Sequence, residues 1–424
     1  MGRIARSGWV AGTVVVVTAG LLVGCDDLGT APTTYPSPTG PAGDAVGLGD
    51  VNEDGVLDVV TAGDDERFGV LLSDGSGGYA PATFAHEDYC RDTVPAATCD
   101  SYRVEGVEDT SAIGWTQLVI SNRRTVGDTV TTELHSRASL GDHFTGSSPV
   151  ASYPAPAVPE VHFGDINGDT SPDLVVVDVS TASPHPSVDV YPGNGLGAFG
   201  DPVTGSRFPN QRVTEVQVAD IDGDPYTDLV LAGSCAFSGE IGEAHVRGCV
   251  QVHLANRAGG FWIATIHLPI DPPVDSIPDI AVLDIDEDGD LDIVGANATS
   301  AEDGGTTGAA PTISVFRGDG RGGFEWEESR PEPAADTTGA VTADFDRDGH
   351  ADLLLATDPA GPAAGETILF GDGTGQFTDP HTLPRTSAQP GLVGDLDGDG
   401  RPDYVQNTTD GIRVFMNRWT TRPG

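Results

Sequence analysis

The sequence predicts an all-β protein, a seven-bladed β-propeller of four-stranded blades, and three observations lead to this fold class. An acidic nine-residue loop followed at once by a short apolar run recurs along the 424 residues. Successive copies start 51 to 64 residues apart, enough chain for four short strands and their turns. Short β-branched runs bounded by Gly, Asp and Pro recur throughout, without a long amphipathic helical pattern. Seven such units are typical of a β-propeller.

The acidic loop nearest the C-terminus runs from Asp395 to Asp403 and shows the chemistry of the other copies. Carboxylates stand at positions 1, 3, 5 and 9, with Gly400 at position 6 and an apolar run afterwards. Carboxylates this close repel one another, so a compact loop needs a hard cation with oxygen ligands, and Ca²⁺ fits that demand best. An EF-hand loop begins similarly, but it places a bidentate Glu at position 12 between two helices. Closure at position 9 before a β-like run excludes the EF-hand.

Six copies keep oxygen-bearing side chains at positions 1, 3, 5 and 9, and we predict that each binds calcium. Copy by copy, these side chains are Asp50, Asn52, Asp54 and Asp58; Asp165, Asn167, Asp169 and Asp173; Asp220, Asp222, Asp224 and Asp228; Asp284, Asp286, Asp288 and Asp292; Asp344, Asp346, Asp348 and Asp352; and Asp395, Asp397, Asp399 and Asp403. A seventh copy keeps Asp109 but has Ser111, Ile113 and Gln117 at the other three positions. We interpret it as a unit that kept its strand and lost its metal.

Two of the six loops depart from the pattern at position 6, where the others have Gly. This position is Thr170 in one loop and Pro225 in another. Neither residue has the conformational freedom that a sharp turn demands. Whether these two loops bind calcium therefore stays open from the sequence.

Each unit continues with a third strand and a Gly-rich turn that ends in an aromatic residue, such as Gly318–Phe324 or Gly371–Phe377. The glycines permit positive φ in a tight hairpin, and the aromatic side chain packs back over the sheet. The last unit has a third strand at Ile412–Phe415 but lacks the turn and a fourth strand. Either residues between about 30 and 44 supply that outer strand and cover an exposed edge, or the last blade is short.

The repeated pattern resembles the FG-GAP/VCBS repeat, found in the N-terminal propeller of integrin α subunits and in bacterial surface proteins. The resemblance covers residues from about 45 to 418, in frame, seven times. It implies that each nine-residue loop joins the first and second strands of a blade and holds one structural calcium ion, about six in all. It also implies a ligand from the backbone carbonyl of position 7, here Val56, Ser171, Tyr226, Asp290, His350 and Arg401.

The N-terminus reads as a targeting segment, followed by a tether. Two arginines precede an apolar run of about 15 residues, a length typical of a secretory signal and short for a membrane span. Leu22-Val23-Gly24-Cys25 resembles the lipobox of bacterial lipoproteins, which implies a signal peptide over 1–24 and a lipidated Cys25. The alternative is a plain signal peptide with an incidental Cys. Residues 25–44 are predicted to tether a 45–424 propeller to a bacterial envelope membrane, on the periplasmic side or at the cell surface.

The charge of the chain limits its possible partners, and its cysteines indicate the compartment in which it resides. Without residues 1–24 the chain has 19 Arg, no Lys and 65 acidic residues, a formal charge of −46, which argues against nucleic acid as a partner. Four cysteines remain beyond Cys25, an even number suited to an oxidising envelope. Three connectivities are possible; we favour the two local pairs, Cys90–Cys99 and Cys235–Cys249.

We expect a non-catalytic binding or adhesion module for protein or glycan. None of the usual hydrolase or phosphate-binding motifs occurs, and nearly every close carboxylate pair already belongs to a metal loop. Three long inserts, Glu87–Arg103, Gly233–Cys249 and Ala298–Pro311, are the candidate binding loops. Arg317-Gly318-Asp319 spells an integrin-recognition tripeptide but lies in a repeat turn, where chance accounts for it. A propeller-type polysaccharide lyase or hydrolase is the alternative function, and the oligomeric state stays undetermined.

Overall fold

The computed structural model describes residues 33–35, 44–62, 68–84, 98–110, 115–126, 128–140, 143–154, 159–179, 187–207, 211–238, 244–262, 266–268, 276–298, 312–331, 337–357, 366–383, 391–408 and 411–419. In these ranges the regular elements are β-strands, β1 to β30. No helix long and apolar enough to cross a membrane occurs within them. The predicted signal peptide, Cys25 and Cys90 lie outside the described residues.

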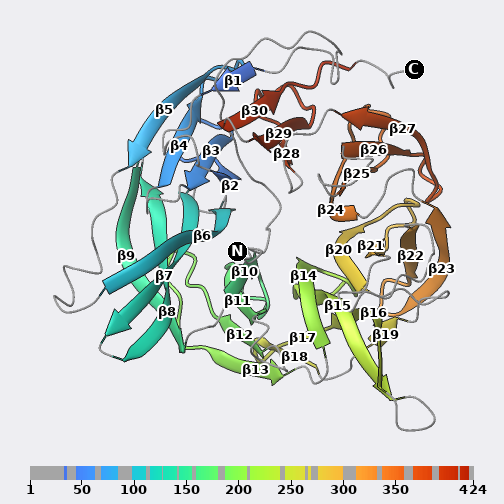
Figure 1. Ribbon diagram of the computed structural model, residues 1–424, viewed down its shortest axis with the longest axis horizontal. Helices are drawn as coiled ribbons and strands as arrows, with labels where there is room; N and C mark the ends of the chain where they lie inside the picture. The colour runs from blue at the N-terminus through green and yellow to red at the C-terminus, as the bar shows by residue number, and fades with distance from the viewer. Residues whose placement is uncertain are drawn as a thin grey trace.

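The described strands form seven four-stranded antiparallel sheets, which stand around one ring in Figure 1. We number these sheets as blades in chain order, so that blade 1 begins with β2. In each blade the first strand lies nearest the centre of the ring, and the following strands lie progressively farther out. The prediction of an all-β, seven-bladed propeller is therefore confirmed.

The strand bounds are regular in five blades and longer in blades 2 and 4. Blades 1 to 3 contain β2 (Asp44–Gly49), β3 (Asp58–Ala62), β4 (Phe68–Ser73) and β5 (Tyr79–Phe84); β6 (Thr98–Thr110), β7 (Trp115–Val126), β8 (Thr129–Leu140) and β9 (His143–Pro154); and β10 (Pro159–Gly164), β11 (Asp173–Asp178), β12 (Ser187–Tyr191) and β13 (Val203–Arg207). Blade 4 contains β14 (Gln211–Ala219), β15 (Asp228–Ser238), β16 (Ala244–His253) and β19 (Ile266–Leu268), with a small ribbon of β17 (Ala255–Asn256) and β18 (Gly260–Phe261). Blades 5 to 7 contain β20 (Ser276–Leu283), β21 (Asp292–Ala298), β22 (Thr312–Gly318) and β23 (Phe324–Pro331); β24 (Thr337–Ala343), β25 (Asp352–Thr357), β26 (Glu366–Gly371) and β27 (Phe377–Leu383); and β28 (Leu392–Gly394), β29 (Asp403–Thr408), β30 (Gly411–Phe415) and β1 (Thr33–Tyr35).

The seventh blade takes its outer strand from the other end of the chain. β1 pairs antiparallel with β30, and Thr34 lies opposite Arg413. Figure 1 shows β1 in blue beside β30 in red. Of the two arrangements that the sequence left open, the protein has the closing strand. The predicted 25–44 tether is therefore partly a piece of the ring, because Thr33–Tyr35 covers an edge that would otherwise be unpaired.

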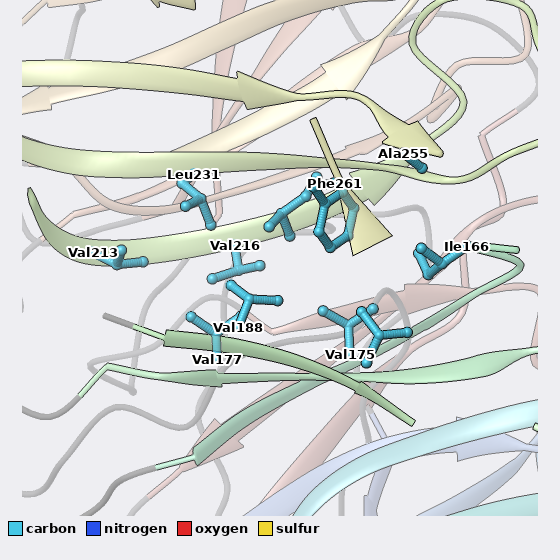
Figure 2. Close-up of a cluster of buried hydrophobic side chains, with 11 residues drawn as sticks. Ile166, Val175, Val177, Val188, Val213, Val216, Leu231, Ala255 and Phe261 are labelled. Carbon is cyan, nitrogen blue, oxygen red and sulfur yellow. The ribbon is translucent and has the colours of Figure 1, made fainter. Parts of the chain in front are cut away.

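Seven clusters of buried apolar side chains hold the ring together, one at each contact between neighbouring blades. The second strands run between two such clusters, so both of their faces are buried. In β11, Leu174 and Val176 pack toward blade 2, whereas Val175 and Val177 pack toward blade 4. Figure 2 shows the cluster between blades 3 and 4, where Val175 and Val177 meet residues such as Val216 and Phe261.

Sheet connectivity divides the connections between two faces of the ring. In an antiparallel sheet, successive connections alternate between the two ends of the strands. The acidic loops (first to second strand) and the Gly-rich turns (third to fourth) therefore share one face, which we call the loop face. The connections from second to third strand, and from each blade to the next, lie on the opposite face.

One predicted binding loop is in fact mostly β-structure. We expected Gly233–Cys249 to be an ordered loop, but β15 and β16 continue through it, paired from Gly233 opposite Cys249 to Ser238 opposite Ala244. The predicted Cys235–Cys249 disulfide is present and crosses this hairpin, with a Cα–Cα distance of 5.8 Å. Cross-strand pairing here satisfies backbone groups that a long loop would have to expose. The other two inserts lie largely outside the described residues.

Candidate metal sites

All six acidic loops fold around the carboxylate at position 1. In blade 7, Asp395 accepts the backbone N–H groups of Asp399 (3.1 Å) and Gly400 (2.8 Å). The carboxylate at position 5 then accepts the N–H of position 7 in every loop, as Asp399 does from Arg401 at 3.0 Å. The same bond occurs in the other five loops, at 2.8 to 3.0 Å. In blade 7 the position 5 carboxylate uses only Oδ1 in this bond, whereas Asp395 accepts the N–H of Asp399 with Oδ1 and that of Gly400 with Oδ2.

Two positions of the loop adopt left-handed backbone, although the sequence pointed to only one. Position 6 has positive φ in five loops, including Thr170 at 69°. Position 4 has positive φ in all six loops, at Glu53, Gly168, Gly223, Glu287, Arg347 and Gly398. Three of these residues are not Gly, so the usual signal for a left-handed residue was missing. Thr170 keeps the common turn, and its N–H still donates to Asp165 at 2.7 Å.

Pro225 changes the loop of blade 4. Proline fixes φ near −65° and has no N–H, so the donor that meets position 1 in the other loops is missing. Gly223 instead donates to Asp220 at 2.9 Å. Asp220, Asp222 and Asp228 still bring one oxygen each to within 4.8 Å of one another. The departure at Pro225 therefore alters the turn without dispersing the carboxylates.

The Asp at position 9 joins three parts of its blade in all six loops. This Asp is at most 1% exposed in each case. One oxygen accepts the N–H of position 2, at 2.7 to 3.1 Å: Val51, Ile166, Ile221, Ile285, Phe345 and Leu396. The other accepts an N–H at or just beyond the end of the third strand, at 2.7 to 2.9 Å: Ser73, Gly193, Ala255, Gly318, Gly371 and Asn417.

Burial raises the pKa of the position 9 carboxyls above their ordinary value. The pKa reaches about 7 at Asp58, Asp352 and Asp403 and about 6 at Asp173 and Asp228. Desolvation is the main cause, and the two backbone N–H donors partly offset it. We call the buried Asp at position 9, with its two backbone hydrogen bonds, the hub of its blade. A cation beside this carboxyl would hold it ionised, so metal binding and the hub would support each other.

The residue at position 2 is a structural member of the site that the sequence pattern did not single out. Its side chain is buried in every loop and packs into the contact with the following blade, as Phe345 does between blades 6 and 7. The carbonyls of Phe345 and Leu396 also accept side-chain hydrogen bonds from Asn417 (2.7 Å) and Ser73 (3.2 Å) of the following blade. An apolar residue between two acidic ones is the signal that could have identified it.

The donor set fits calcium. Four loops bring oxygens of three carboxylates to within 4.8 Å of one another, namely Asp220, Asp222 and Asp228; Asp284, Asp286 and Asp292; Asp344, Asp346 and Asp348; and Asp395, Asp397 and Asp399. In blade 5 the Oδ1 atoms of Asp284 and Asp286 are buried without a hydrogen-bond partner. A cation would satisfy these carboxylate oxygens, and hard oxygen ligands suit Ca²⁺. The metal's identity and the carbonyl ligands of position 7 stay predictions.

Loops with Asn at position 3 arrange their ligands differently. In blade 3 the Asn167 amide nitrogen lies 3.1 Å from both carboxylate oxygens of Asp173. In blade 1 the Asn52 amide donates to Asp54 at 3.0 Å. In each case the amide nitrogen contacts a carboxylate, which leaves the amide oxygen as the ligand that position 3 can offer. These two loops thus carry fewer charges but the same number of candidate oxygens.

The Arg317-Gly318-Asp319 tripeptide is engaged within the propeller. Arg317 pairs with Asp286 and Glu327, each at 2.9 Å. The Asp319 carboxylate accepts the N–H groups of Arg321 (2.9 Å) and Gly323 (2.8 Å) inside its own turn. Both charged side chains are therefore used by the fold, as expected for a tripeptide that arises from the repeat pattern.

Blade 2 keeps the strand register of the repeat without the acidic loop. Gln117, at position 9, lies opposite Glu108, just as Asp403 lies opposite Gly394. The strands β6 and β7 continue two pairs farther, to Thr110 opposite Trp115. The interpretation of this segment as a unit that kept its strand agrees with the register, and Ser111 and Ile113 lie outside the described residues.

Comparison with known proteins finds the repeat within this chain. The FG-GAP-like repeat matches residues 165–231 and 284–355, each stretch spanning two consecutive acidic loops with their second strands. Similar solved structures include a protein from Lactobacillus plantarum (13% identity, TM-score 0.46, 81% of this chain and 86% of that chain). They also include the Dos1 propeller (9%, 0.45, 86% and 75%) and the exotype rhamnogalacturonan lyase YesX (15%, 0.37, 88% and 65%). No curated protein sequence matches the chain.

Proposed function

Because this chain is a β-propeller of FG-GAP-like repeats, we propose that it is a calcium-stabilised, non-catalytic binding module of a bacterial cell envelope. Its partner is a protein or a glycan. The observation that carries the structural role of calcium is the buried Asp at position 9. In six blades this residue joins the acidic loop to the end of the third strand, so a cation in the loop acts on the scaffold.

Recognition belongs to the face opposite the loop face. The strands that flank all three long inserts end there, because these inserts connect second to third strands or one blade to the next. β15 has 11 residues where β11 has 6, so the β15–β16 hairpin continues roughly 15 Å beyond the corresponding strand end. The Cys235–Cys249 disulfide stiffens this hairpin. A rigid scaffold that presents irregular connections is a common basis for binding.

The anchor in this proposal is a lipid on Cys25. Residues 26–32 are all that separate this Cys from β1, a span of at most about 25 Å. The edge of blade 7 would thus stand close to the membrane, while the rest of the ring extends away from it. More than one acyl chain would be needed for stable attachment, since a single chain binds membranes only reversibly.

The binding role is tested with the mature chain in detergent, first by glycan-array screening and by pull-down from envelope extracts. Ligands found in this way are then measured against a variant in which residues 235–247, which include Cys235, are replaced by a two-residue turn. Cys249→Ser in the same variant removes the thiol that would be left unpaired. We expect binding to fall at least about tenfold while the calcium-dependent melting temperature stays close to wild type. Trp262→Ala, which removes an exposed side chain that follows the Gly-rich turn of blade 4, is the matched control and should bind normally.

The enzymatic alternative has its own readout. Release of unsaturated or reducing ends is followed while the same chain is incubated with acidic and neutral polysaccharides. Turnover that survives purification, and that is lost when a residue outside the acidic loops is substituted, would replace the binding role with catalysis. Absence of turnover together with measurable affinity supports the binding module.

Anchoring is tested by metabolic labelling with an alkyne fatty acid. The wild-type chain should take up label and fractionate with membranes, and Cys25→Ser should do neither. Equal membrane association of the two forms would contradict a lipid anchor.

A further inference from the structure

In the loop of blade 7, arginine side chains contact the carboxylates at positions 3 and 5. Arg418 lies just beyond β30 and places one guanidinium nitrogen 2.6 Å from Asp397 Oδ2 and the other 2.8 Å from Asp399 Oδ2. Arg401 adds a second contact to Asp399 Oδ2, at 2.5 Å. A single guanidinium thus bridges positions 3 and 5 of the same loop.

The bridged oxygens are the ones that a metal would use. The Oδ1 atoms of Asp397 and Asp399 accept backbone N–H groups of the loop, at 3.3 Å from Asp399 and 3.0 Å from Arg401. Their Oδ2 atoms are the remaining ligands, and both contact Arg418. The Asp397 side chain is 7% exposed and that of Arg418 is 34% exposed, so this pair is partly shielded from water. Charge-assisted contacts of this kind are stronger than neutral ones and are screened less when partly buried.

Blade 5 provides the contrast. Arg317 also reaches an acidic loop, where it contacts Asp286 Oδ2 at 2.9 Å and Asp292 Oδ2 at 3.4 Å. The Oδ1 atoms of Asp284 and Asp286 nevertheless stay buried and without a hydrogen-bond partner. An arginine and a cation can therefore share the loop of blade 5. In blade 7 either the arginine or a cation can neutralise the position 3 and 5 carboxylates, but not both at once.

We propose that Arg418 is a built-in cation of the seventh loop, so that calcium enters this loop only in competition with the guanidinium. This inference rests on the proposed calcium-stabilised scaffold. It divides the six sites into two classes: the loop of blade 7 binds calcium more weakly than the other loops and exchanges it at higher concentration.

The neighbours of Arg418 link this exchange to the closure of the ring. Asn417 donates to Asp403 and to the Phe345 carbonyl, each at 2.7 Å. Trp419 is buried in the contact between blades 6 and 7, where it packs edge-on against His381 at 5.1 Å between ring centroids. Release of Arg418 by calcium would therefore act on a segment that braces the last blade, the one completed by β1.

Calcium titration by calorimetry, on the mature chain in detergent, tests the proposal. We expect the wild type to show one site weaker than the rest. Arg418→Gln should raise the affinity of that site about tenfold, which moves it toward the tight class. Arg418→Lys keeps the charge but loses the two-pronged contact, so it should lie between the two. Asp397→Asn should weaken or abolish the same site, which assigns it to blade 7.

Arg321→Gln is the matched control, since it removes one positive charge from an exposed position on the loop face of blade 5. It should shift no site by more than about twofold, because exposed charges are strongly screened. Tryptophan fluorescence gives a second readout: a calcium-dependent change seen in wild type should be absent in Trp419→Phe. A single affinity class that Arg418→Gln does not alter, or a shift that Arg321→Gln reproduces, would overturn this inference and leave the scaffold role standing. Absence of calcium binding in every variant would overturn both.

Discussion

Blade 2 and the six other blades differ in what the residue at position 9 of the repeat holds together. In the six, an Asp at position 9 accepts one N–H from the loop and one from the end of the third strand. In blade 2 Gln117 takes its place, and its amide nitrogen donates to the Gly197 carbonyl of blade 3 at 3.0 Å. Ser136 Oγ donates to the same carbonyl at 2.8 Å. The buried acceptor that joins parts of one blade is thus replaced in blade 2 by donors that join this blade to blade 3.

Two features of the repeat are lost together in blade 2. Strand pairing extends to Thr110 opposite Trp115 before its first connection and to Leu140 opposite His143 before its third, so both connections are short. The other blades have an acidic loop beside the end of the third strand, and all but the seventh continue into a Gly-rich turn. The position 9 carboxylate accepts hydrogen bonds from the acidic loop and from the end of the third strand. Blade 2 lacks this carboxylate, so neither segment has that acceptor there. The acidic loop is therefore coupled to the end of the third strand, and blade 7 shows that this coupling does not require a Gly-rich turn.

The largest expected effect is that of removing calcium, which should act on six blades and spare the second. When the free calcium concentration is about ten times the Kd of each site, calcium binding stabilises the folded state by about 1.4 kcal/mol per site. Over six sites, on a chain of this size, chelation should lower the melting temperature by roughly 10 °C. Hydrogen exchange should locate the change in the acidic loops and the ends of the third strands, with β7 and β8 unaffected. An unchanged melting temperature after exhaustive chelation would contradict structural calcium.

The next effect is that of removing the hub itself. Asp352→Ala leaves the buried N–H groups of Phe345 and Gly371 without an acceptor. Each such group costs about 1–3 kcal/mol, so the free energy of unfolding should fall by about 4 kcal/mol. Urea unfolding in chelator measures it, because the loss must persist when no calcium is bound.

Gln117→Ala in blade 2 is the matched substitution. It removes a donor to Gly197, whose carbonyl keeps Ser136 as a partner. The expected loss is therefore only about 1 kcal/mol. If Asp352→Ala cost no more than Gln117→Ala in chelator, the Asp would act through calcium alone and the hub would be wrong.

The repeat and the ring could be predicted from the sequence because they depend on a local pattern copied seven times. The closing strand could be named only as one of two arrangements, because β1 and β30 are almost the whole chain apart and three residues carry no distinctive signal. The hub partner Ala255 lies 27 residues from Asp228 and donates through its backbone, which no side-chain pattern reveals. Position 4 was missed for a related reason: Glu53, Glu287 and Arg347 adopt positive φ without being Gly, because the loop's hydrogen bonds impose it.

The two kinds of blade should also respond differently to pH. In chelator, burial gives Asp58, Asp352 and Asp403 a pKa of about 7, well above the unfolded value of 3.8. The native state then binds more protons than the unfolded state between these values, so their contribution to stability is fully present at low pH and is lost as pH rises through about 7.

The chelated protein should therefore melt higher near pH 5 than near pH 7.5, and the stabilisation by added calcium should grow as pH rises, since the metal needs ionised ligands. In blade 2 the buried His135 has a lowered pKa through desolvation, so its contribution falls as pH drops below its ordinary 6.5. Melting curves of wild type and of His135→Gln across this pH range separate the contribution of the buried carboxyls from that of His135. A chelated protein that melts lower at acidic pH in both forms would contradict the role of the buried carboxyls.

The smallest effect concerns the backbone of position 6, and a reciprocal pair of substitutions measures it. Thr170 has a φ of 69°, which costs a β-branched residue about 1–2 kcal/mol relative to Gly. Thr170→Gly keeps the N–H that meets Asp165 and should raise the free energy of unfolding by about 1 kcal/mol. Gly55→Thr imposes the same strain in blade 1, at a φ of 87°, where an added Cβ meets nothing within 4 Å. It should lose a similar amount, so that the two changes mirror each other in urea unfolding with calcium present. If Gly55→Thr cost nothing, the left-handed turn would not be what position 6 requires, and Pro225 in blade 4 would be an ordinary variant of the loop instead of an altered turn.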